Sequence, residues 1–428
     1  MVTPSSQSDS NPVVDTDETA AATTADSSTM AKSSDELEAP AENSSSESQN
    51  LSLGQSWLYV GGALCAVYGL FVSIDLLNIG FQSILGPEAE GLLTMAANPW
   101  LGLLLGILAT ALIQSSSIVT TLLVGLVAGG LPIATAIPMV MGANLGTTIT
   151  NTLVSLGYIG DDEDFERGFA AATIHDCFNL VALFIFFPLE QLLHPLEHLS
   201  QWLLSQSAHL NNIPNIFNSI AFMSPLYWLM QPTRWLMIYA VNHLPGPWDS
   251  LLLFGISVGG LMASVTALGW LMRRWLDTPA KDIIHWTTGH GYSLGGLATG
   301  AGLTALLQSS SMTTSLMVPL ASAGMVTLQD IYPFVLGANI GTCVTALLAT
   351  LAVKSPVALQ LALVHLSYNL LAVLLVYGIP PLRAIPLTMA EKLATATQRY
   401  RIVAVAYVIG LFFLLPFLAL WLSLTLAT

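Results

Sequence analysis

Two copies of one polar quartet stand in otherwise apolar sequence. A glutamine followed by three serines occurs at Gln114–Ser117 and again at Gln308–Ser311, each at the end of a run rich in Gly, Leu and Ala. Serine hydroxyls can donate hydrogen bonds to an oxyanion, and hydroxyl and amide oxygens can also coordinate a monovalent cation that has lost its water. The repetition predicts a duplicated binding site for small ions.

Two further landmarks follow each quartet in the same order. The sequence GANLGT begins 28 residues after Gln114, and GANIGT begins 29 residues after Gln308. Each is followed by a histidine with an asparagine four residues later, as His175 with Asn179 and His365 with Asn369. A chance pair of serine runs would not keep this register. The landmarks define repeat 1 at residues 98–190 and repeat 2 at residues 292–381.

The charges around these landmarks restrict the ligand and the source of energy. No Lys or Arg occurs from position 100 to 166, nor between Lys281 and Lys354. The charge of a bound anion would therefore be balanced by helix dipoles and by cations that bind with it. Such mutual dependence of cation and anion affinity is the thermodynamic basis of symport. The pattern GxxxxGK[ST] for nucleotide phosphates does not occur, so an ion gradient is expected to supply the energy, without a cofactor.

The composition predicts an all-α polytopic membrane protein, because 54% of the residues are hydrophobic and only 9% are charged. Two Gly-rich stretches with the quartets at their middle, 99–128 and 293–322, are expected to be re-entrant helical hairpins. Each repeat is expected to combine one hairpin with an interrupted helix unwound at its GAN(L/I)GT glycines, in inverted topology. Seven membrane spans are expected at Ser56–Ile79, 132–157, 168–190, 250–272, 331–352, 357–380 and 401–426.

The segments outside the repeats have distinct expected roles. Residues 1–50, with ten carboxylates and one lysine, are expected to be a disordered cytoplasmic tail. Residues 51–97 carry the first span, 191–291 an extracytoplasmic loop with an interfacial helix and a linking span, and 382–428 a cytoplasmic connector and the last span. The basic clusters at 273–281 and 383–401 predict a cytoplasmic N-terminus. Hairpin 1 is then expected to enter from outside and hairpin 2 from the cytoplasm, with the C-terminus outside.

The same residues could serve other functions. His175 and His365 lack a second ligand at metal-binding spacing, so helix-to-helix hydrogen bonding is the favoured interpretation. A serine hydrolase using Ser116, His175 and Asp176 is disfavoured, because adjacent side chains diverge on a helix and no nucleophile elbow is present. A phosphate sensor, or a symporter of another oxyanion, stays open. Cys65, Cys177 and Cys343 show no metal or redox spacing.

The repeated motifs resemble those of the type II sodium-dependent phosphate cotransporters. The resemblance runs from about 98 to 425, apart from 191–248, and rests on QSSS, GANLGTTITNTLVSLG, FAAATIHDCFN, GANIGTCVTALLATL and LQLALVHLSYN. It implies sodium-coupled uptake of inorganic phosphate in the cell membrane, with phosphate, sodium and lipid as the partners and no nucleic acid. It leaves the oligomeric state undefined.

The resemblance also implies which residues contact the ions. The phosphate contacts would be Gln114, Ser115, Ser116, Ser117, Gln308, Ser309, Ser310 and Ser311. The sodium contacts would be Ser117, Thr120, Thr121, Asn144, Thr147, Thr148, Asp176, Ser311, Thr313, Thr314, Asn339 and Thr342.

One acidic residue within a span is a candidate for charge coupling. Asp176 is the only carboxylate in the landmark segments, and repeat 2 has Leu366 at the equivalent place. An ionisable group inside a span is costly and is a functional candidate by default. In the resembled family, an aspartate here marks electrogenic members, so electrogenic transport is expected. Segment 191–248 contains no cysteine and no N-x-S/T sequon, unlike the animal members, which favours a prokaryotic membrane.

Overall fold

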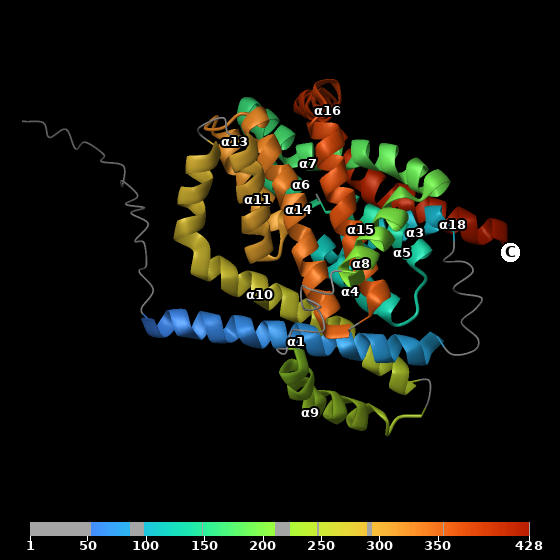
Figure 1. Cartoon of the computed structure of the whole chain (residues 1–428). Coiled ribbons are helices and arrows are strands. Elements are labelled where there is room, and N and C mark those ends of the chain that lie inside the picture. The colour runs from blue at the N-terminus through green and yellow to red at the C-terminus, as the bar shows by residue number, and fades with distance from the viewer. Residues whose placement is uncertain are drawn as a thin grey trace, which may run out of the picture. The chain divides into compact units, whose positions relative to one another are not determined.

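The protein is a bundle of helices in a computed structural model (Figure 1) that describes residues 53–85, 98–147, 149–209, 223–245, 248–288, 293–353 and 355–427. The expected N-terminal tail lies outside these residues. No strand occurs in the part of the chain that is described, which confirms the all-α class. Among the described residues, seven helical segments are long and apolar enough to cross a membrane, in agreement with the expected spans: Trp57–Ile84, Ile133–Tyr158, Asp162–Leu193, Trp248–Met272, Leu328–Val353, Pro356–Tyr377 and Ile402–Leu422.

The helices in chain order are α1 (Leu53–Leu85), α3 (Pro99–Ile113), α4 (Ser116–Ala128), α5 (Ile133–Leu145), α6 (Ile149–Ser155), α7 (Asp162–Leu193), α8 (Pro195–His209), α9 (Met223–Val241), α10 (Trp248–Thr288), α11 (Ser293–Leu307), α12 (Ser310–Ser315), α13 (Met317–Ser322), α14 (Leu328–Val353), α15 (Pro356–Ala372), α16 (Pro380–Arg399), α17 (Ile402–Ile409) and α18 (Leu415–Ala427).

Each expected hairpin consists of two arms made of short helices. Hairpin 1 is α3 followed by α4, and hairpin 2 is α11 followed by α12 and α13. The first arms, α3 and α11, are 15 residues each, so each is roughly 22 Å long. That length is short of the roughly 30 Å of bilayer hydrocarbon, so neither arm can cross alone. The quartets lie at the turns between the arms.

The two hairpins open toward opposite ends of α7. The end of hairpin 2 lies at the start of α7, where a Cβ on Gly168 would collide with the Ser322 hydroxyl. The start of hairpin 1 lies near the other end, where the Trp100 and Phe187 rings pack edge-on with centroids 4.7 Å apart. Gly168 and Phe187 are about 19 residues, or roughly 29 Å of helix, apart. This geometry supports repeats of opposite orientation.

Glycines let the first arm of each hairpin pack closely against the next helix of its own repeat. A Cβ on Gly142 would collide with the Leu103 carbonyl oxygen, and a Cβ on Gly337 would collide with the Leu297 carbonyl oxygen. The GAN(L/I)GT glycines therefore serve as contact surfaces, because only a residue without a Cβ admits a backbone that close.

The expectation of an interrupted helix in each repeat is wrong for repeat 2. In repeat 1, α5 ends at Leu145 and α6 begins at Ile149. In repeat 2, α14 runs unbroken from Leu328 to Val353 through both glycines of GANIGT. Glycine can permit a helix to unwind, but in α14 it permits close packing against the α11 backbone.

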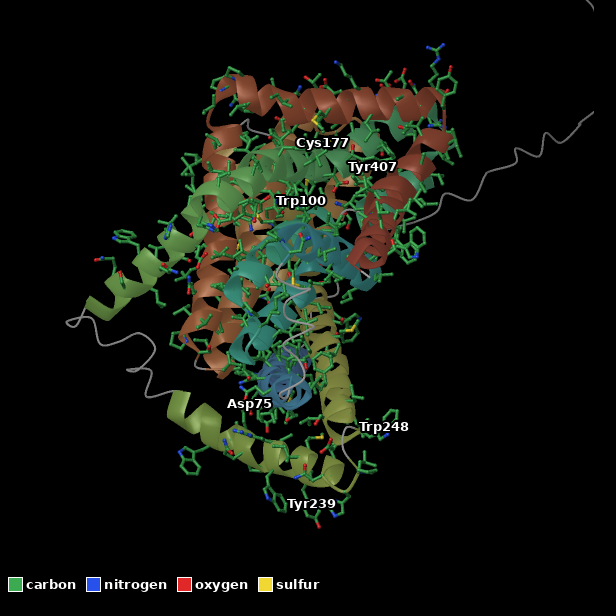
Figure 2. The ribbon with its side chains drawn as sticks, turned by 90° about the vertical axis from the view of Figure 1, so that its right-hand side faces the viewer. Asp75, Trp100, Cys177, Tyr239, Trp248 and Tyr407 are labelled. Atoms are coloured by element: carbon green, nitrogen blue, oxygen red, sulfur yellow. The ribbon has the colours of Figure 1, made fainter. Side chains whose placement is uncertain are left out.

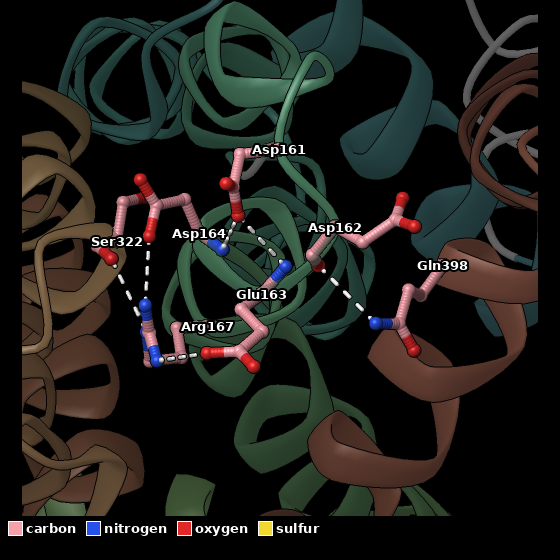
Figure 3. Close-up of polar contacts among 7 residues, drawn as sticks. All are labelled: Asp161, Asp162, Glu163, Asp164, Arg167, Ser322 and Gln398. Carbon is pink, nitrogen blue, oxygen red and sulfur yellow. Dashed lines mark hydrogen bonds and ion pairs between the residues drawn. The ribbon is translucent and has the colours of Figure 1, made fainter.

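Polar contacts join the start of α7 to hairpin 2 and to α16 (Figure 3), where Gln398 Nε2 donates to the Asp162 carbonyl oxygen at 3.3 Å. Asp161 caps α7 by accepting hydrogen bonds from the backbone of Glu163 and Asp164, both at 3.0 Å. Arg167 donates to the Ser322 carbonyl oxygen at 3.2 Å, which ties α7 to the end of hairpin 2. Arg401 pairs with Asp162 at 2.5 Å. The acidic loop 161–166, the open end of hairpin 2 and the end of the basic connector at Arg401 therefore share one end of the structure. This arrangement agrees with the expectation that hairpin 2 enters from the side of the basic clusters.

The apolar run within 191–248 forms α9, which confirms the expected helix there. Arg234 of α9 pairs with Asp75 of α1 at 3.4 Å, and the Tyr68 and Thr233 hydroxyls lie 2.6 Å apart. Figure 2 shows Asp75 between α9 and the repeats. These contacts across α1 were not foreseen from the sequence, and they bind α9 to a membrane span.

Candidate functional site

Both quartets form the same backbone turn. Gln114 and Gln308 adopt left-handed conformations with φ of 62° and 55°. The serine after each is extended and caps the next helix, because Ser115 Oγ accepts from the Ile118 N–H and Ser309 Oγ accepts from the Met312 N–H, both at 3.3 Å. A left-handed glutamine is uncommon, and its occurrence at the same place in both repeats indicates a functional constraint.

The glutamine amides are held in one orientation. Gln114 Nε2 donates to the Ala111 carbonyl oxygen at 2.9 Å, and Gln308 Nε2 donates to the Ala305 carbonyl oxygen. Each side chain therefore presents Oε1, an acceptor, away from its own helix. Gln114 is exposed and Gln308 is buried. Both were predicted to contact phosphate, and Oε1 suits a cation better than an unprotonated phosphate oxygen.

The last two serines of each quartet are buried in the first turn after the hairpin tip. Ser116 and Ser310 are each 3% exposed. Ser117 Oγ has no hydrogen-bond partner among the described residues, whereas Ser311 Oγ donates to the Thr147 carbonyl oxygen at 3.2 Å. That last bond joins hairpin 2 to the break between α5 and α6 in repeat 1.

The threonines that were predicted as sodium ligands differ in whether their hydroxyls already make hydrogen bonds. Thr120, Thr313 and Thr314 donate to carbonyl oxygens of their own helical turns. Thr147 and Thr342 do the same. The Thr121 hydroxyl is buried without a partner in the described part of the chain. Thr148 lies outside the described residues.

Two buried clusters of hydrogen-bonded side chains, here called brackets, connect the repeats, and each contains one histidine and two asparagines. Asn339 of repeat 2 contacts repeat 1, with Oδ1 2.6 Å from His175 Nε2 and with Nδ2 donating to Asn179 Oδ1 at 2.8 Å. Asn144 of repeat 1 makes the mirrored contacts with repeat 2, with Oδ1 3.1 Å from His365 Nε2 and with Nδ2 donating to Asn369 Oδ1 at 2.7 Å. All six side chains are no more than 2% exposed.

These crossed brackets give the second and third landmarks of both repeats the same structural role. The expected helix-to-helix hydrogen bonding of His175 and His365 is confirmed, and its partners lie in the other repeat. Asn144 and Asn339 were predicted as sodium ligands, but their side-chain oxygens are paired with the histidines. The brackets fix the second and third landmarks of each repeat against those of the other.

Two residues at the junction between the repeats were not predicted as site residues from the sequence. Asn151 Nδ2 donates to Thr314 Oγ1 of hairpin 2 at 2.7 Å, while Asn151 Oδ1 has no partner among the described residues. Thr150 Oγ1 donates to Gln114 Oε1 at 2.9 Å. Both lie in the predicted motif GANLGTTITNTLVSLG, but repeat 2 has Ala346 in place of Asn151, so comparing the repeats could not identify it.

Asp176 is buried in α7 and contacts the last membrane span. Its Oδ2 accepts a hydrogen bond from the Tyr407 hydroxyl of α17 at 2.8 Å, and its Oδ1 has no partner in the described residues. Figure 2 shows Tyr407 near this part of α7, beside the labelled Cys177. A carboxylate with one free oxygen inside a membrane span can accept a cation.

Fold and site together define an all-α polytopic membrane protein with two related halves, each contributing a polar hairpin tip. The Na+/Pi-cotransporter family matches residues 70–222 and 252–414. The chain belongs to this family, in agreement with the resemblance of its motifs.

The curated relatives are named as sodium-dependent phosphate transport proteins. The chain is 32% identical to sodium-dependent phosphate transport protein 2B of Homo sapiens over 448 residues, which cover 84% of this chain and 64% of that protein. It is 31% identical to sodium-dependent phosphate transport protein 2A of Rattus norvegicus, over 87% of this chain and 68% of that protein. The match therefore spans just under two thirds of the human relative. No solved structure matches the chain.

Proposed function

We propose that the protein is a secondary active transporter that carries inorganic phosphate into the cell together with sodium. One observation carries this proposal: two hairpin tips of the same sequence and backbone conformation belong to hairpins that open toward opposite ends of α7. Paired half-helices from inverted repeats are typical of alternating-access transporters. The names of the relatives support phosphate and sodium as the transported ions.

Phosphate would bind between the two tips. The hydroxyls of Ser116, Ser117, Ser310 and Ser311 are hydrogen-bond donors, and the N–H groups at the start of α4 add donors and a favourable dipole. Ser115 and Ser309 contribute less to binding, because their hydroxyl oxygens cap the following helices. A phosphate held by neutral donors keeps its charge, so bound cations must compensate for it.

Sodium would bind beside the tips and at Asp176. The oxygens available to it are the unpartnered Ser117 Oγ, Thr121 Oγ1 and Asp176 Oδ1, with the Thr147 backbone carbonyl oxygen near Ser311. A divalent phosphate needs two sodium ions for neutrality. A third ion at Asp176 gives each transport cycle one net positive charge, so transport would be electrogenic.

The remaining parts of the proposal concern placement in the cell. In this proposal the protein lies in the cell membrane of a prokaryote, with its N-terminus in the cytoplasm. Repeat 1 comprises residues 98–190 and repeat 2 comprises residues 292–381, and the other segments have the boundaries given above. The loop Asp161–Glu166, the connector α16 and the open end of hairpin 2 would then face the cytoplasm together.

Serine substitutions at the two tips test this function. Ser116→Ala and Ser310→Ala each remove one buried hydroxyl, and both should raise the phosphate concentration for half-maximal uptake about tenfold or more. Ser205→Ala is the matched control, because Ser205 is exposed and bonds only within its own helix, to the Trp202 carbonyl oxygen. Unchanged uptake in both tip variants would exclude the tips as the phosphate site. Binding of phosphate with no flux in the parent protein would favour a sensor.

A further inference from the structure

We infer that the corner between α7 and α8 binds a divalent transition metal ion, of which zinc is the commonest, through Glu190, His194 and Glu197. Each side chain offers one ligand atom, and the three atoms all lie within 4.8 Å of one another. These residues belong to neither quartet and to neither bracket. The inference therefore goes beyond the proposed function and does not depend on it.

The three side chains converge because the chain changes direction at His194. This residue ends α7 in a left-handed conformation with φ of 49°, and α8 begins at Pro195. Glu190 lies one turn before the end of α7, and Glu197 lies in the first turn of α8. The end of one helix and the start of the next thus place three potential metal ligands around one point.

Glu190 is a buried carboxylate without a basic partner. It is 2% exposed, and its oxygens accept hydrogen bonds from the Leu196 N–H at 2.8 Å and the Glu197 N–H at 3.1 Å. The sequence has no Lys or Arg between Arg167 and Arg234. A carboxylate has about four acceptor positions, so both oxygens of Glu190 can still bind a metal. The two backbone bonds hold the carboxylate in one orientation, as outer contacts do in metal sites.

His194 and Glu197 face each other without a hydrogen bond. His194 Nδ1 and Glu197 Oε2 are 3.7 Å apart, which is beyond hydrogen-bonding distance. The other oxygen of Glu197 accepts from Gln201 Nε2 at 3.3 Å, so Oε2 is the one that points to His194. Two ligand atoms of a tetrahedral zinc ion lie roughly 3.4 Å apart. Small rotations of the side chains would bring all three ligand atoms to that spacing.

Helix capping accounts for Glu190 but not for the whole group. A carboxylate that only capped α8 would be repelled by a second carboxylate within 4.8 Å. Among the described residues, the one ion pair that either carboxylate makes is with His194, and a neutral imidazole does not offset their charge. Buried charges are ordinarily paired or coordinate metals. A divalent cation would neutralise the two carboxylates together.

The mixture of ligands indicates the class of metal. An imidazole nitrogen with two carboxylates suits zinc and its first-row neighbours, whereas magnesium and calcium prefer shells made of oxygen alone. The His194 side chain is 52% exposed and that of Glu197 is 22% exposed. The ion would therefore have access from solvent, and water can fill the remaining coordination position.

Metal binding by the purified full-length chain tests the site without requiring transport. The protein, freed of any affinity tag and treated with a chelator, is titrated with Co²⁺ in buffer without phosphate. Binding is followed by the visible absorption of the cobalt ion and by the thermal unfolding midpoint. We expect one saturable equivalent, its displacement by Zn²⁺, and a higher midpoint with either metal, because the ion would join α7 to α8.

Two variants remove single ligands with little change of shape. Glu197→Gln keeps an acceptor for Gln201, and His194→Asn places in the left-handed position a residue that tolerates it. Each should weaken Co²⁺ binding by at least about tenfold. The controls are Glu391→Gln and His243→Asn, because both parent residues are exposed and lie on other helices or at their ends. If Glu197→Gln does not fold, His194→Asn makes the same test.

The outcomes separate this inference from the proposed function. Absence of saturable Co²⁺ binding, or equal affinity in the parent protein and in both ligand variants, would overturn the metal site and leave phosphate transport standing. Equal stabilisation by Mg²⁺ and Zn²⁺ would also overturn it. Parent protein that binds Co²⁺ through His194 and Glu197 but takes up no phosphate would support the metal site and overturn the proposed function.

Discussion

Replacement of Asn339 by alanine should loosen the bracket between the repeats. The change removes the contact with His175 at 2.6 Å and the hydrogen bond to Asn179 at 2.8 Å, and it leaves both partners buried. Hydrogen bonds between membrane helices average about 0.6 kcal/mol, and an unsatisfied buried partner costs about 1–3 kcal/mol. For two bonds we expect Asn339→Ala to lower the free energy of unfolding by about 1–4 kcal/mol.

A double-mutant cycle isolates the bracket from other effects of the substitution. The free energy of unfolding in mixed micelles titrated with dodecyl sulfate would be measured for Asn339→Ala, His175→Ala and the double variant. The coupling energy should be about 0.5–2 kcal/mol. Asn242→Ala is the control, because Asn242 is exposed and its loss should change stability by less than about 0.5 kcal/mol.

Two results would refute this account of the bracket. Additive effects of the two substitutions would mean that Asn339 and His175 do not act together. An Asn339→Ala variant of unchanged stability but much weaker sodium dependence would mean that Asn339 is a sodium ligand, as its motif first suggested.

Three further predictions follow from single contacts. Asp176→Asn removes the carboxylate beside Tyr407 while keeping the shape of the side chain, so uptake should continue without acceleration by an inside-negative potential; retained acceleration would contradict the role of Asp176. Tyr407→Phe removes the hydrogen bond to Asp176 Oδ2, and it should change the sodium concentration for half-maximal uptake while leaving that for phosphate nearly constant. Gly337→Ala forces a Cβ against the Leu297 carbonyl oxygen and should destabilise the protein by about 1–3 kcal/mol, whereas Gly302→Ala, with nothing within 4 Å, should be neutral or stabilising.

Much of the architecture could be predicted from the sequence because it depends on composition and periodicity. The seven spans follow from apolar length, and the two hairpins follow from short apolar arms on either side of Gln114 and Gln308. The continuous α14 was missed because glycine has two structural uses. Flexibility and close packing leave the same sequence signal, and only the contact of Gly337 with Leu297 distinguishes them.

The polar contacts between distant helices could not be predicted in the same way. The spacing of His175 and Asn179 indicated one helix face, but their pairing with Asn339 depends on how the two repeats cross. The contacts of Asp176 with Tyr407 and of Asp75 with Arg234 join segments more than 150 residues apart. No local pattern in the sequence indicates which of these distant residues will be in contact.

Phosphate uptake by purified protein in liposomes tests the central claim most directly. Radiolabelled phosphate would be followed under an inward sodium gradient and under the same gradient of potassium, with an inside-negative potential imposed or absent. We predict accumulation above equilibrium with sodium alone, and faster accumulation with the potential. The absence of sodium-dependent accumulation by folded, correctly inserted protein would contradict the assignment of this chain as a sodium-coupled phosphate symporter.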